Sequence, residues 1–190
     1  MSAVSEVKST ALGFTTVVVN DESIDTYTYS NYLGWKISSV QKVPSLLDPS
    51  RSDGSTSEVA LVDITKDREP ELIVRRGPAN FYMAADSANM AAFKWSSSSG
   101  GWIRIFFPTP SDPDWIAYDS EGKYRTLRWG FVRDGEVFEE FGYLRSGGHV
   151  DDVAIRYQWN GTEFTIVGNE KISPACYAIN GVTSGFCYGE

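Results

Sequence analysis

Residues 127–145 read LRWGFVRDGEVFEEFGYLR, and this stretch decides the fold class. Two runs rich in apolar and aromatic residues flank Asp134-Gly135, a pair typical of a two-residue hairpin turn because glycine adopts positive φ without a steric penalty. The pattern predicts antiparallel strands over 127–133 and 136–145. In that register Arg133 faces Glu136, Val132 faces Val137 and Phe131 faces Phe138, and each pairing is favourable across strands.

Three other segments share a second pattern, in which two aromatic residues separated by one residue precede a polar turn and a further aromatic residue follows it. The segments are YTYSNYLGWKI (27–37), FKWSSSSGGWIRI (93–105) and YQWNGTEFTI (157–166). Alternation with a period of two is typical of strands, so each segment is predicted to form a hairpin with aromatic side chains on one face. Recurrence of the pattern indicates an internal repeat.

The chain of 190 residues is therefore predicted to be one all-β domain, residues 1–190, with a disordered tail over 1–10. Repeated antiparallel hairpins with roughly 14 to 16 strands favour a small β-propeller-like array of about four blades, and a β-sandwich or barrel is the alternative. Helix formers over 83–92 leave a loop or one to two helical turns as the expectation there.

Charge and hydropathy limit the partners. Lys and Arg number 17 against 25 Asp and Glu, which gives a formal net charge of −8. Nucleic-acid binding is disfavoured because the basic residues are scattered and form no patch. No apolar run approaches the ~20 residues of a spanning helix, so membrane insertion is not expected.

The stretch VALVDITKDREPELIV, residues 59–74, combines two apolar runs with an acidic loop. Over about residues 59–105 the chain resembles FG-GAP and VCBS-type proteins, whose integrin-like β-propeller blades carry such loops. The resemblance implies a calcium site at Asp63, Asp67 and Glu71, with the hydroxyl of Thr65. Arg68 replaces the turn glycine of the motif, and Lys66 adds positive charge. We therefore expect no bound cofactor, with calcium as the alternative.

No motif of a nucleophilic or zinc enzyme is present, and we do not expect the one histidine, His149, to be catalytic. A pair of carboxylates suited to hydrolysis stays open, because 25 acidic residues supply many pairs. Aromatic residues that flank turns are the candidates for binding, since exposed Trp and Tyr offer a large contact area at low entropic cost. They are Tyr32, Trp35, Trp102 and Trp115.

The two cysteines bear on the compartment. A loop over residues 180–183 would place Cys176 directly opposite Cys187, close enough for a disulfide. Two free thiols and a metal site are the alternatives. A disulfide implies an oxidising environment, so we expect a secreted or periplasmic protein whose leader is absent from this chain, with a cytoplasmic protein as the alternative. Asn160-Gly161-Thr162 is a glycosylation sequon in a predicted turn.

Together these features favour a non-enzymatic, extracytoplasmic binding protein that recognises another protein, of the inhibitor or toxin-immunity type. A carbohydrate-binding module and a secreted hydrolase with a carboxylate pair are the alternatives.

Overall fold

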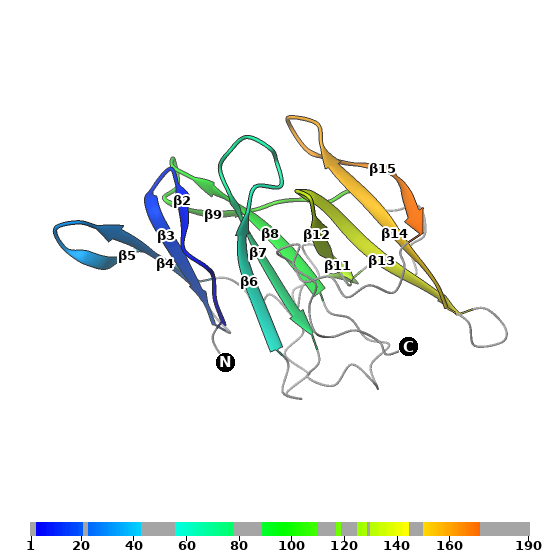
Figure 1. Ribbon diagram of the computed structural model, residues 1–190, viewed down its shortest axis with the longest axis horizontal. Coiled ribbons are helices and arrows are strands. Elements are labelled where there is room, and N and C mark those ends of the chain that lie inside the picture. The colour runs from blue at the N-terminus through cyan, green and yellow to red at the C-terminus, as the bar shows by residue number, and fades with distance from the viewer. Residues whose placement is uncertain are drawn as a thin grey trace.

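The computed structural model describes residues 3–20, 23–42, 56–77, 89–109, 117–118, 125–128, 130–144 and 150–171. Within these ranges the chain forms fifteen strands in three antiparallel sheets (Figure 1). The all-β prediction is confirmed: the described ranges contain no helix, and none of their sheets closes into a barrel. The sequence predicts a propeller-like array of about four blades, and the described ranges hold three sheets.

The first sheet lies at the N-terminal end of the array. Its strands are β1 (Ala3–Val4), β2 (Lys8–Thr10), β3 (Gly13–Val19), β4 (Ser23–Ser30) and β5 (Gly34–Lys42). Both β1 and β2 pair with β3, so the prediction of a disordered tail over 1–10 is wrong for residues 3–10. Ser5, between the two short strands, is also held against β3. Its Oγ accepts a hydrogen bond from the backbone N–H of Val17, and its own N–H donates one to the Val17 carbonyl.

The second sheet is the central layer. Its strands are β6 (Thr56–Val62), β7 (Glu71–Gly77), β8 (Asn89–Ser96), β9 (Gly101–Arg104), β10 (Ala117–Tyr118) and β11 (Arg125–Arg128). Residues 89–92 belong to β8, so the expectation of a loop or helical turns is wrong there. Met90 and Ala92 contact one neighbouring layer while Ala91 contacts the other, and burial on both faces outweighs the helix propensity of this segment.

The third sheet contains the predicted hairpin. Its strands are β12 (Phe131–Arg133), β13 (Glu136–Leu144), β14 (Val150–Trp159) and β15 (Phe164–Lys171). The predicted register is confirmed at all three positions of the β12–β13 hairpin. The turn residues Asp134 and Gly135 have φ of 54° and 72°, as a two-residue hairpin turn with two positive φ angles requires.

The expected strand over 127–133 is divided. Leu127 and Arg128 pair with β8 of the second sheet, whereas 131–133 pair with β13 of the third. Gly130 lies buried between them, and a Cβ built on it would come 2.6 Å from the Cβ of Met90. The chain crosses between layers at the residue that has no side chain.

Two apolar clusters join the layers. Val17, Val19 and Ile24 of the first sheet pack against one face of the second sheet. The other face of the second sheet packs against the third sheet through a cluster that includes Tyr157 and Phe164. Figure 1 shows the three sheets side by side, from blue through green to orange.

The three aromatic segments occupy equivalent positions in the three sheets. They form the hairpins β4–β5, β8–β9 and β14–β15. Each hairpin holds a cross-strand ring pair in edge-to-face contact, with centroids 5.5, 5.4 and 5.2 Å apart. These pairs are Tyr29–Trp35, Trp95–Trp102 and Trp159–Phe164.

Two of these hairpins also share an irregularity. The pairing register shifts between Thr26 and Tyr27 in the first sheet, and between Arg156 and Tyr157 in the third. In both places the shift falls at the first aromatic residue of the segment. A bulge at a matching position is a feature of backbone geometry, so the similarity of these hairpins extends beyond their composition.

Candidate functional site

The acidic loop between β6 and β7 is organised around one buried carboxylate. Glu71 is 1% exposed, and its Oε2 accepts the backbone N–H groups of Ile64 (2.9 Å) and Thr65 (3.2 Å). The Thr65 hydroxyl donates to Oε1 at 2.9 Å. Burial raises the pKa of Glu71 above 4.5, although these hydrogen bonds and the nearby Lys94 act in the opposite direction.

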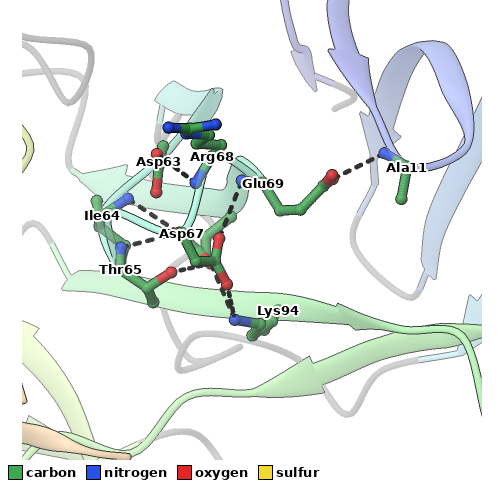
Figure 2. Close-up of polar contacts among 9 residues, drawn as sticks. Ala11, Asp63, Ile64, Thr65, Asp67, Arg68, Glu69 and Lys94 are labelled. Atoms are coloured by element: carbon green, nitrogen blue, oxygen red, sulfur yellow. Dashed lines mark hydrogen bonds and ion pairs between the residues drawn. The ribbon is translucent and has the colours of Figure 1, made fainter. Parts of the chain in front are cut away.

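Lys94 of β8 supplies a cation to this loop. Its ammonium group donates to Asp67 Oδ2 and lies 3.9 Å from Glu71 Oε1. Figure 2 shows Lys94 reaching up to Asp67 from the strand below the loop. Partial burial works to raise the pKa of Asp67, but hydrogen bonds from Lys94 and from the N–H of Glu69 outweigh it and lower that pKa below 3.8. A lysine ammonium thus binds two of the three carboxylates that the FG-GAP resemblance assigns to calcium.

Asp63, the third of those carboxylates, fixes the backbone of the loop. Its Oδ2 accepts the N–H of Arg68 at 2.9 Å, and its Oδ1 is buried without a hydrogen-bond donor. Arg68 and Lys66 have φ of 77° and 60°. The loop therefore retains a left-handed turn at the position where the related motif carries glycine. Calcium binding here stays a prediction.

The loop also links the three sheets. The N–H of Ala11, in the turn between β2 and β3, donates to Glu69 Oε2 at 2.7 Å (Figure 2). The Lys94 ammonium lies 5.9 Å from the ring centroid of Trp159 in the third sheet, within range of a cation–π contact. These contacts join layers of the fold.

The four aromatic candidates have different environments. Tyr32 is 97% exposed in the β4–β5 turn, and Trp35 is 46% exposed at the start of β5. Trp102 is 3% exposed, so its prediction as a surface contact is wrong. Its Nε1 donates to Thr26 Oγ1 at 2.9 Å in the core between the first two sheets. Trp115 lies outside the described residues.

Trp35 belongs to a larger apolar surface that residue-by-residue inspection of the sequence missed. Along β4, Ile24, Thr26 and Thr28 are buried toward the second sheet, so the alternate side chains point away from it. We call the surface that these and their cross-strand neighbours form the outward face. Its apolar members are Val4, Phe14, Val18, Tyr27, Tyr29, Trp35, Ile37 and Val40.

Most of this outward face is open to solvent. Six of the eight side chains are classed as exposed: Val4, Phe14, Tyr29, Trp35, Ile37 and Val40. In the described residues the charged members of the face, Asp25 and Lys42, stand at the end of the sheet away from the β4–β5 turn. The signal in the sequence was the period of two along these strands. Counted with that period, apolar residues fall on both faces of the first sheet.

Several other candidates lie outside the described residues, namely His149, Cys176 and Cys187. Asn160 of the sequon is exposed in the β14–β15 turn, as expected. Among the acidic residues, Glu139 is fully buried and accepts a hydrogen bond from the Tyr157 hydroxyl at 2.6 Å.

In comparisons with known proteins, no family model, no curated protein and no solved structure matches the chain. The resemblance to FG-GAP and VCBS-type repeats therefore stays a prediction from the sequence. The described segments hold no helix with the length and hydrophobicity of a membrane span.

Proposed function

We propose that the protein is a non-enzymatic binding protein that recognises another protein through the outward face of its first sheet. The observation that carries the proposal is the cluster of exposed Phe14, Tyr29, Trp35, Ile37 and Val40 on one sheet surface. Contiguous exposed apolar surface costs free energy in water, and in soluble proteins it commonly marks an interaction site.

A protein partner fits this surface better than a glycan. Binding sites for sugars need several polar groups positioned around the ligand, whereas the charged side chains of this face stand at one end of the sheet. The rings of Tyr29 and Trp35 meet at 62°, so they do not form a flat platform on which a sugar ring could stack. Aromatic anchors beside aliphatic residues are typical of protein interfaces.

Within this proposal we expect the inhibitor or toxin-immunity type of function, acting outside the cytoplasm. The supporting feature is the net charge of −8, which speeds association with a basic partner and suppresses binding to acidic surfaces.

The test compares two isoleucines of similar exposure. Ile37 is 55% exposed on the outward face, and Ile103 is 52% exposed on β9 of the second sheet. Immobilised wild-type protein, Ile37→Glu and Ile103→Glu would each be incubated with extract of the source organism, and retained proteins quantified by mass spectrometry. We expect a partner retained by wild type and Ile103→Glu and lost with Ile37→Glu. Equal retention by all three would contradict the proposal, and glycan-array binding would support the carbohydrate alternative.

A further inference from the structure

The three ring pairs are equivalent in the fold but differ in what covers them. Trp102 of the second sheet packs on the first sheet, and Phe164 of the third packs on the second. In both cases the aromatic hairpin of one layer covers a face of the layer before it. No described layer precedes the first sheet, and Trp35, which stands where Trp102 and Phe164 stand, is 46% exposed.

A terminal repeat that is meant to face water has a polar outer surface. The outward face instead has the composition of the two buried aromatic faces. Tyr27 matches Phe93 and Tyr157, and the pair Tyr29–Trp35 matches the two buried or half-buried pairs. The first sheet is therefore built like an internal layer of a stack, and no sheet in the described residues covers its outward face.

The buried interface between the first two sheets shows what such a neighbour must offer. Trp102 packs among Val17, Val19 and Ile24, which are aliphatic side chains on strands. It also needs an oxygen, since its Nε1 donates to Thr26 Oγ1. Trp95, the partner of Trp102 in the ring pair, has a buried Nε1 without a hydrogen-bond acceptor. Of the two rings, Trp102 is thus the one that makes a polar contact in this interface.

The described part of the chain does not offer a free face of this kind at its other end. On the third sheet, the surface turned away from the second sheet carries Phe138 and Ala154, and both are fully buried. Head-to-tail stacking of copies through these two surfaces is therefore disfavoured.

We infer that the outward face binds a β-sheet surface of a partner protein, one that presents aliphatic side chains and a hydroxyl or carbonyl oxygen to the Nε1 of Trp35. This inference rests on the proposed function and specifies its partner. The contact is sheet on sheet, with side chains of two layers interdigitating as they do between the first and second sheets.

The experiment places a photo-cross-linking benzoylphenylalanine at Ile37 and, as a control, at Ile103. Both full-length proteins would be irradiated in extract of the source organism, and cross-linked peptides identified by mass spectrometry. We expect the Ile37 probe to capture one protein at a strand that carries Val, Ile, Leu or Thr residues. The Ile103 probe should not capture it.

Two substitutions then test the hydrogen bond with the captured protein, in purified form. Trp35→Phe keeps a ring but removes the N–H donor, and it should weaken binding about 5- to 30-fold because an acceptor is left unpaired. Tyr29→Phe removes a hydroxyl from the same face and should leave affinity within about twofold, since the equivalent Trp95 makes no hydrogen bond.

The outcomes separate the inference from the proposed function. Capture of no protein at Ile37 above the Ile103 control would overturn both. A captured partner with cross-links on a helix or loop, or with no loss of affinity in Trp35→Phe, would overturn only the sheet-on-sheet inference. Cross-links between two copies of this chain, with sedimentation velocity showing a dimer that Ile37→Glu dissociates, would also overturn it.

Discussion

At the scale of single residues, the acidic loop shows how a motif can keep its geometry while its chemistry changes. Arg68 adopts φ of 77° where the related motif carries glycine, and Asp63 holds its N–H. Lys94 brings an ammonium group to Asp67 and Glu71. The polar contacts of the loop are thus made with the protein's own backbone and a lysine.

The left-handed turn predicts that Arg68→Gly stabilises the protein. A residue with a Cβ destabilises the folded state by roughly 1–2 kcal/mol in the left-handed region, and glycine removes this cost. Glycine is also more flexible in the unfolded chain, which offsets about 0.5–1 kcal/mol of the gain. We expect a net gain of about 0.5–1 kcal/mol in urea unfolding. Arg68→Ala is the control, because it keeps the Cβ and should bring no gain. A loss of stability in Arg68→Gly would contradict this account of the turn.

The opposite pKa shifts of Glu71 and Asp67 predict that their contributions to folding stability depend on pH in opposite directions. The pKa of Glu71 is raised in the folded state, so its contribution to stability is present below about pH 4.5 and is lost as the pH rises through the folded pKa. The pKa of Asp67 is lowered, so its contribution is present above 3.8 and is lost as the pH falls.

Urea unfolding of wild type, Glu71→Gln and Asp67→Asn at pH 3 and pH 7 measures both effects. The stability of wild type relative to Glu71→Gln should be greater at pH 3 than at pH 7. Relative to Asp67→Asn it should be greater at pH 7. The same sign for both variants would refute the assignment of the two carboxyl groups.

At the scale of elements, Gly130 decides where one strand ends and the next begins. The chain leaves the second sheet after Arg128 and enters the third at Phe131, and Gly130 lies against Met90 at the crossing. A side chain at this position would meet the Cβ of Met90 on β8, and that atom cannot move without displacing a central strand.

Gly130→Ala should therefore lower the free energy of unfolding by about 1–3 kcal/mol, the usual cost of overpacking. Thermal or urea unfolding measures it. Stability within 0.5 kcal/mol of wild type, about the effect of a neutral surface change, would show that the crossing is less tightly packed than the 2.6 Å approach indicates.

At the scale of the whole molecule, the expected compartment rests on a predicted disulfide between two cysteines that lie outside the described residues. A disulfide between Cys176 and Cys187 would close a loop of about 12 residues and stabilise the fold by roughly 3 kcal/mol. We expect the native protein to show no free thiol after unfolding and alkylation without reductant, and two after reduction. Two alkylated cysteines without reductant would remove the disulfide and the main argument for a secreted or periplasmic protein.

The sequence by itself determined the local structure. The Asp134-Gly135 turn and its three cross-strand pairs follow from the left-handed preference of the turn residues and from a period of two, which are properties of neighbouring residues. The three aromatic hairpins follow for the same reason. By these rules alone, residues 127–133 read as one strand and 89–92 as a loop or helical turns.

Only the tertiary structure decided which face of each hairpin is covered. Trp35 and Trp102 occupy equivalent positions in equivalent hairpins, yet one is 46% exposed and the other 3%. The difference comes from the neighbouring layer: the first sheet covers Trp102 and brings together residues distant in the chain, such as Thr26 and Trp102, whereas no sheet in the described residues covers Trp35. Burial is a property of that packing, and no pattern among adjacent residues encodes it.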